Sequence, residues 1–194
     1  MKILSLEKIQ NPFLTSTMAA EALGVQRASA KLACHRYVKN DLLLRLKRDL
    51  YVTSRAWERF REEDFFMAAN RLQVPAYISF TTALSYYQIT SQIQQGFVES
   101  AATVRSWSRQ VGGVQFKYMK LLPAFYAGFI KRGQFFIATP EKALLDALYL
   151  MTLGRYRLDL SAVDWEKLDA KKTVRQSKIF PPRSRNRMLE LWKH

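Results

Sequence analysis

The sequence predicts an α+β protein, with an N-terminal winged helix-turn-helix followed by a mixed α/β domain that has a small antiparallel sheet and a helical C-terminal tail. Three observations predict this fold class. Two short helix patterns flank a glycine and precede an apolar hairpin pattern. Strand-like runs then alternate with helix patterns. The last basic segment contains two helix patterns separated by consecutive prolines. We expect the domains to span residues 1–55 and 56–194.

The first helix patterns are short and well delimited. A short apolar stripe before Pro12 predicts one helix, and TSTMAAEALGV predicts the next, capped by one of residues 15–17. Gly24 predicts a left-handed end of that second helix. A helix ending in Leu-Gly-Val and soon followed by another helix is typical of a helix-turn-helix. The stripe of the first helix consists of Leu4, Leu6 and Ile9, and Phe13 can extend it.

The next helix, within VQRASAKLACHRYVKN, has one apolar and one cationic face. Ala30, Cys34 and Tyr37 repeat at helical spacing and predict its buried side. In a recognition helix, residues near the N-terminal end approach bases and flanking cations approach phosphates. The residues predicted to contact DNA, the first four of them on the base side, are Gln26, Arg27, Ser29, Lys31, His35, Arg36 and Lys39.

A hairpin pattern follows directly in NDLLLRLKRDLYVTS. Two apolar runs flank a tip that carries Arg45, Lys47 and Arg48. Helix, helix and hairpin in this order predict a winged helix-turn-helix whose tip faces phosphates, where each neutralised phosphate releases counterions. Cations at a hairpin tip are also common as solvated residues or as protection of a sheet edge.

The middle of the chain predicts the sheet. AYISFTTALSYYQIT predicts a strand over residues 77–80 and then a helix. SAATVRSWS and VQFKYMKLL predict strands around the turn signal Gly112-Gly113, and AGFIKR and QFFIA predict a hairpin around Gly133. We therefore expect a mostly antiparallel sheet beside helices.

ATPEKALLDALYLMTLG predicts a capped helix, with Thr139 at the N-cap and Pro140 at the first helical position. Glu141 and Asp146 are paired acids, but their spacing of five residues puts them on different sides of the helix. The sequence offers no nucleophile–base pair, metal constellation or glycine-rich phosphate loop, so we expect no enzymatic activity. The predicted buried face consists of Leu144, Leu145, Leu148 and Met151.

The charge of the chain predicts an acidic partner. Its 194 residues include 31 Lys and Arg against 16 Asp and Glu, a formal net charge of +15. Self-repulsion of this size destabilises a compact state unless a partner offsets it. Residues 1–55 have a net charge of +6, residues 100–140 contain six cations and no acid, and residues 171–194 have a net charge of +7. Three separated zones indicate more than one interaction surface.

Several classes of protein are disfavoured. No stretch approaches the ~18 uninterrupted apolar residues of a membrane span. The opening MKILSLEKIQ lacks the apolar region of a signal peptide, so we expect a cytoplasmic protein with no membrane partner. Cys34 is the single cysteine, which excludes an internal disulfide, and His35 and His194 are the two histidines, too few for a Cys/His zinc site. We expect no metal and no cofactor.

Three segments together resemble a known family. RLKRDLYVTS, YISFTTALSYYQIT and FFIATPEKALLDALYL resemble the AbiE-type antitoxins, the transcriptional regulators of bacterial abortive-infection toxin–antitoxin systems. The resemblance covers most of the chain up to Leu150. It implies that the winged helix represses the pair's own promoter by binding repeated operator sites in double-stranded DNA. It also implies that the C-terminal domain counteracts a nucleotidyltransferase-like toxin. In such wings a glycine often occupies the position of Asp49, and aspartate tolerates the left-handed turn.

Two basic zones are candidates for toxin neutralisation, one in the middle of the chain and one in the tail. The candidate residues are Arg105, Arg109, Lys117 and Lys120 in the middle zone and Lys171, Lys172, Arg183, Arg185 and Arg187 in the tail zone.

Two alternative functions need no operator-specific DNA binding. A basic protein-interaction module would use the same zones to clamp an acidic partner. An RNA-binding protein would stack bases on Trp107, Phe116 and Tyr118, although these aromatic side chains also fit the buried side of the sheet.

Overall fold

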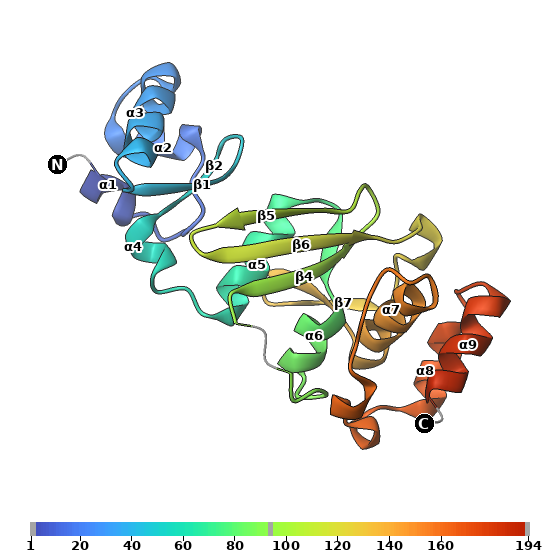
Figure 1. The fold of residues 1–194 in the computed structure, drawn as a ribbon. Coiled ribbons are helices and arrows are strands. Elements are labelled where there is room, and N and C mark those ends of the chain that lie inside the picture. The colour runs from blue at the N-terminus through green and yellow to red at the C-terminus, as the bar shows by residue number, and fades with distance from the viewer. Residues whose placement is uncertain (1–2, 93–94, 193–194) are drawn as a thin grey trace. The chain divides into compact units, whose positions relative to one another are not determined.

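The computed structural model describes residues 3–92 and 95–192, so Lys2 and His194 lie outside the described residues. The chain divides into two compact units, which we call the first unit (residues 1–68 and 111–113) and the second unit (residues 69–110 and 114–194). Each unit contains both helices and strands, which agrees with the expected α+β class (Figure 1). The residues from 56 to 68, expected in the C-terminal domain, belong to the first unit.

The first unit begins with three helices and a two-stranded antiparallel sheet (Figure 1). Thr15 caps the second helix by accepting a hydrogen bond from the Met18 amide, and Gly24 ends it with a φ of 63°. Both of these features were expected from the sequence. The elements are α1 Ile3–Glu7, α2 Ser16–Leu23, α3 Arg27–Lys39, β1 Leu43–Lys47, β2 Leu50–Thr53 and α4 Ser54–Trp57, followed by α5 Glu62–Leu72, which continues into the second unit.

The core of the first unit joins all three helices to the sheet. Ala30 and Cys34 of α3 are buried, as expected, whereas Tyr37 is half-buried. The expected apolar stripe of α1 is wrong in detail, because Ile3 and Leu6 are buried and Leu4 is 53% exposed. The helix has only five residues, so a single i, i+3 pair covers its inward side. The buried cluster consists of Ile3, Leu6, Leu14, Ala19, Ala30, Cys34, Leu43 and Tyr51.

The second unit is built on one sheet with helices beside it (Figure 1). Its elements are β3 Ala76–Ile78, α6 Phe80–Tyr86, β4 Phe97–Ala102, β5 Trp107–Val111, β6 Val114–Lys120, β7 Phe129–Arg132, β8 Phe135–Ala138, α7 Pro140–Thr152, α8 Ala170–Ser177 and α9 Pro182–Trp192, with short 3-10 helices at Pro123–Phe125, Leu160–Ala162 and Trp165–Lys167.

The sheet is larger and more mixed than the small antiparallel sheet that we expected. Within the described ranges, six strands lie in the order β5-β6-β4-β3-β8-β7. β3–β4 and β7–β8 are antiparallel, but β3–β8 and β4–β6 are parallel. Parallel neighbours need crossover connections between segments far apart in sequence, and local turn signals do not reveal these. SAATVRSWS also proves not to be one strand, because it contains the end of β4 and the start of β5.

α7 is the central helix of the second unit. The Thr139 hydroxyl accepts a hydrogen bond from the Lys142 amide, and Pro140 opens the helix, as expected. Every residue from 141 to 150 is buried, so the helix has no solvent face along most of its length. Met151, expected inside, is half-buried. The helix packs against α6, α8 and α9, which cover it on several sides.

In residues 3–92 and 95–192, no helix is long and apolar enough to cross a membrane. Across the same ranges, no group of three or more His, Cys, Asp and Glu side chains is arranged to hold a metal ion.

Candidate nucleic-acid interface

The cationic face of α3 is open to solvent. All seven α3-region residues that the sequence analysis selected are exposed, while Ala30 and Cys34 on the other side are buried. The helix turns on a 3.6-residue period, so this division follows from the spacing of its apolar residues. Leu32, which was not selected, shares the exposed side and is 67% exposed. The exposed set is Gln26, Arg27, Ser29, Lys31, His35, Arg36 and Lys39.

The β1–β2 hairpin adds cations beside this helix in the same unit. Arg45 and Arg48 are exposed and Lys47 is half-buried. Arg48 and Asp49 form the turn between the strands, and Asp49 has a φ of 57°. Aspartate thus adopts the left-handed conformation expected at this position. The strand pairing is irregular between Arg45 and Lys47, which changes the side-chain alternation just before the tip.

Asp49 does more than permit the turn. Its carboxylate accepts a hydrogen bond of 2.9 Å from the backbone amide of Ser16, at the first turn of α2. The same carboxylate forms an ion pair with the Arg27 guanidinium, with an N–O distance of 3.1 Å. Arg27 Nε in turn donates to the Ser16 hydroxyl at 3.1 Å. The three side chains form a cluster, which we call the Asp49 cluster, that ties the hairpin tip to the starts of α2 and α3.

The Asp49 cluster changes the expected role of Arg27. Hydrogen bonding from Ser16, with a further contribution from the Arg27 guanidinium, holds the pKa of Asp49 below its usual value. Asp49 therefore stays ionised and offsets one positive charge at the start of α3. Arg27 remains 57% exposed, but its guanidinium already has an anionic partner. Sequence reasoning missed the cluster because Ser16 and Asp49 lie 33 residues apart.

The fold is similar to that of the RV2827C protein from Mycobacterium tuberculosis. That crystal structure superimposes with a TM-score of 0.64, covering 98% of this chain and 74% of that chain. The sequences are 11% identical, so the likeness is one of fold alone. No family model and no curated protein matches the sequence.

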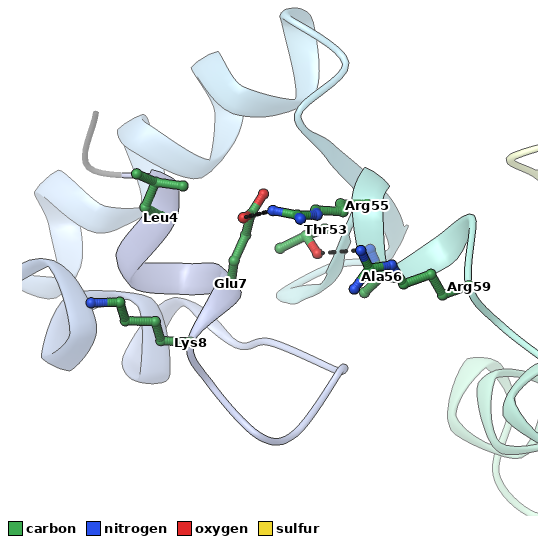
Figure 2. Close-up of a pocket in the computed structure, with 7 residues that line it drawn as sticks. All are labelled: Leu4, Glu7, Lys8, Thr53, Arg55, Ala56 and Arg59. Atoms are coloured by element: carbon green, nitrogen blue, oxygen red, sulfur yellow. Dashed lines mark hydrogen bonds and ion pairs between the residues drawn. The ribbon is translucent and has the colours of Figure 1, made fainter.

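A separate cavity of about 400 Å³ lies in the first unit, between α1 and the end of β2 (Figure 2). The carboxylate of Glu7 and the guanidinium of Arg55 point toward each other across it, 3.2 Å apart. This ion pair removes much of the positive charge that Arg55 would bring. No residue predicted to contact DNA is among the described residues that line the cavity: Leu4, Glu7, Lys8, Thr53, Arg55, Ala56 and Arg59.

The middle-zone candidates lie on β5 and β6 and beside them. Arg105 and Lys120 are exposed, and Arg109 and Lys117 are half-buried. Arg105 lies over the Trp107 ring, with its guanidinium carbon 5.3 Å from the ring centroid. Lys117 and Lys120 are both on β6, three residues apart, so their side chains lie on opposite faces of the sheet.

The tail-zone candidates lie on α8 and α9. Lys171, Arg183 and Arg187 are exposed, and Arg185 is half-buried. Lys172 is engaged within the unit, because its ammonium lies 2.7 Å from the Glu141 carboxylate of α7. Arg187 bonds to Glu190 one helical turn later. Lys172 is thus the tail candidate whose charge has a buried structural partner.

The RNA-stacking alternative fails for two of its three aromatic residues. Phe116 is 0% exposed and Tyr118 is 1% exposed, so neither ring can accept a stacked base. Trp107 is half-buried and stacks on Tyr118, with ring centroids 5.2 Å apart and planes 10° apart. The alternative interpretation, that these side chains form the core beside the sheet, is confirmed for Phe116 and Tyr118.

A polar cluster around α7 was not predicted from the sequence. Lys142 and Asp146 are completely buried and form an ion pair one turn apart. Tyr77 and Ser79 each donate a hydrogen bond of 2.8 Å to Asp146 Oδ2, and Lys142 Nζ donates to the Tyr77 hydroxyl at 2.9 Å. The signal was present, because opposite charges at i and i+4 lay within an apolar helix pattern.

Proposed function

We propose that the chain is a DNA-binding transcriptional repressor whose first unit is a winged helix-turn-helix, and that it acts as the antitoxin of a toxin–antitoxin pair. One observation carries the DNA-binding half. The cationic side of α3 is exposed, while its apolar side closes the core of the unit. An exposed polar helix with clustered cations is what entry into a major groove requires.

The hairpin supports the same proposal. Arg45 and Arg48 are exposed on the element that follows α3 in the chain. In a winged helix such cations neutralise phosphates without reading sequence. The Asp49 cluster fixes the tip to the starts of α2 and α3, which gives the cations a defined position relative to the helix.

The antitoxin half of the proposal rests on the resemblance to the AbiE-type family, carried above all by ATPEKALLDALYL. In the structure this segment is α7, the buried centre of the second unit. We infer that its residues hold the unit together, and that the solvent-exposed basic zones carry toxin antagonism.

The DNA-binding proposal is tested by comparing promoter and random duplexes in a fluorescence-anisotropy titration. Lys31→Ala should weaken binding to the chain's own promoter by about 1–3 kcal/mol and weaken binding to random duplex less. Arg45→Ala and Arg48→Ala should weaken binding to both duplexes similarly. Each should also reduce the slope of log affinity against log salt concentration by about one.

The matched control is Lys131→Ala, which removes an exposed cation from β7 of the second unit. If Lys31, Arg45 and Arg48 variants all bind duplex as the unchanged protein does, the winged-helix proposal is wrong. A basic protein-interaction module would then be the better interpretation.

A further inference from the structure

The Asp49 cluster uses only part of the Arg27 guanidinium. Arg27 is the first residue of α3, and its Nε donates to the Ser16 hydroxyl at 3.1 Å. Its Nη2 donates to Asp49 Oδ2, also at 3.1 Å. An arginine carries more N–H donors than these two contacts use, so each Nη atom keeps a hydrogen for another acceptor. More than half of the Arg27 side chain is exposed, so an outside acceptor can reach it.

The same cluster holds the guanidinium in one orientation. Asp49 Oδ1 accepts a hydrogen bond from the Ser16 amide at 2.9 Å, which leaves Oδ2 for Arg27. Ser16 is 0% exposed, so the carboxylate is anchored to buried backbone at the start of α2. The guanidinium is therefore fixed at two points, the Ser16 hydroxyl and the Asp49 carboxylate. A side chain that is already ordered loses less conformational freedom when it contacts a ligand.

The ion pair also reduces the attraction of Arg27 for phosphates. Within the part of the chain that the structure describes, Lys31, Arg36 and Lys39 of α3 form no ion pair, whereas Arg27 does. Phosphates occur at every position of a duplex, so contacts with them add affinity but carry no sequence information. Because Asp49 offsets its charge, Arg27 gains less than the other α3 cations from a phosphate at an arbitrary position.

A guanine base offers Arg27 a different kind of acceptor. Its O6 and N7 atoms face the major groove, and an arginine meets them with two parallel hydrogen bonds, provided that its fork is correctly oriented. We propose that Asp49 is a specificity-determining positioning residue, which holds Arg27 ready for a guanine edge and withholds its charge from phosphates. This inference rests on the proposed function, because it requires the first unit to bind duplex DNA.

Asp49→Asn separates the two contacts of the carboxylate. The asparagine oxygen can still accept from the Ser16 amide, but its amide nitrogen cannot accept from Arg27. In fluorescence anisotropy, binding to random duplex should become roughly two- to five-fold tighter, since an exposed ion pair no longer competes with phosphate. The slope of log affinity against log salt concentration should become steeper by about one. The ratio of promoter to random affinity should fall, because the fork is no longer held for the base.

A variant without Arg27 shows whether this gain passes through its guanidinium. In an Arg27→Ala background, Asp49→Asn should tighten binding to random duplex no more than Asp41→Asn does in the unchanged protein. Asp41 is the matched control, because it is an exposed acid of the same unit that also has a positive φ. If Asp49→Asn tightens binding equally with and without Arg27, only the loss of an acid matters, and the proposal is overturned.

Arg27→Lys tests the same idea without changing Asp49, and it serves if Asp49→Asn does not fold. Lysine keeps the positive charge but lacks the planar fork. This variant should bind random duplex as the unchanged protein does and lose part of its preference for the promoter. An unchanged preference would show that the fork of Arg27 reads no base.

Promoter duplexes with 7-deazaguanine identify the base contact. Each such duplex lacks the N7 acceptor of one guanine and leaves every phosphate in place. At one position the replacement should weaken binding of the unchanged protein but not of Arg27→Ala. If the two proteins respond alike at every guanine, Arg27 does not read a guanine and the proposal is wrong.

The failure of this inference can be distinguished from failure of the proposed function. If the unchanged protein binds no duplex, or binds promoter and random duplex equally, the repressor proposal fails and the role of Asp49 fails with it. If the unchanged protein prefers its promoter and Asp49→Asn keeps that preference in full, DNA binding stands and only the role of Asp49 is overturned.

Discussion

At the scale of single residues, the buried ion pair between Lys142 and Asp146 is coupled to the stability of the second unit. Burial lowers the pKa of Lys142 and raises that of Asp146, and their mutual attraction opposes both shifts. Breaking a buried pair by removing one partner costs more than the pair contributes, because the remaining charge is left uncompensated. The two residues therefore act as a unit.

Lys142→Met should lower the free energy of unfolding by about 3–5 kcal/mol at neutral pH. Asp146 would then keep its hydrogen bonds from Tyr77 and Ser79 but lose its cation. Because burial holds the folded-state pKa of Asp146 above its unfolded value, the neutral acid becomes favourable as the pH falls. The decrease in the free energy of unfolding, measured by urea denaturation, should therefore be smaller at mildly acidic pH.

The double variant Lys142→Met with Asp146→Asn provides the comparison, since asparagine keeps an acceptor and carries no charge. It should be more stable than Lys142→Met alone at neutral pH, with little dependence on pH. If the single and double variants lose the same free energy of unfolding at every pH, the pair is not ionised in the folded protein.

At the scale of elements, the β1–β2 hairpin depends on one aspartate that joins three segments. A glycine would suit its φ of 57° better. The hydrogen bond to Ser16 and the ion pair to Arg27 offset that conformational cost. The tip of the hairpin is thus held by the side chain of Asp49 as well as by the pairing of its strands.

Asp49→Gly should lower the free energy of unfolding by about 1 kcal/mol, the usual cost of losing a capping hydrogen bond. The folded-state pKa of Asp49 is lowered, so its contribution is present above the unfolded pKa and is lost as pH falls through the folded pKa. The difference between the two proteins should therefore narrow in strong acid, as measured by thermal unfolding.

Asp41→Gly is the matched control, because Asp41 is exposed and also has a positive φ, of 54°. It should be neutral or slightly stabilising, since glycine relieves the left-handed conformation. If both glycine variants behave alike, the Asp49 cluster contributes nothing to stability.

The elements also show what the sequence could predict. Thr15, Gly24, Thr139 and the Gly112-Gly113 turn were all predicted, because caps and turns depend on residues close together in the chain. The parallel pairs β3–β8 and β4–β6 were not, because they join distant segments. The Asp49 cluster was missed for the same reason, because Ser16 and Asp49 lie 33 residues apart.

At the scale of the whole molecule, the net charge of +15 is divided among surfaces on both units. The cations of α3 and the hairpin lie on the first unit, and the middle and tail zones lie on the second. If the two units carry separate functions, charge changes on one should leave the function of the other intact.

Lys171, Arg183 and Arg187 of the tail zone are exposed. Their combined charge reversal should abolish rescue from a co-expressed nucleotidyltransferase-like toxin if the tail zone antagonises the toxin. Binding to promoter duplex should persist. Growth of cells producing the toxin measures rescue, and anisotropy measures DNA binding.

The comparison is a combined reversal of Arg105, Arg109 and Lys120 in the middle zone, which should retain rescue if the tail zone alone antagonises the toxin. If instead the middle set abolishes rescue and the tail set does not, the middle zone antagonises the toxin. Unaltered rescue in both sets would contradict antagonism through either basic zone.

Cys34 gives the first unit a built-in chemical reporter. It is the chain's single cysteine, it is buried on the apolar side of α3, and burial raises the pKa of its thiol. A thiol-reactive reagent can therefore modify the protein at one position only, and only when the packing around α3 opens. The rate of that modification, with and without duplex, would measure directly how far a bound ligand suppresses opening of this helix.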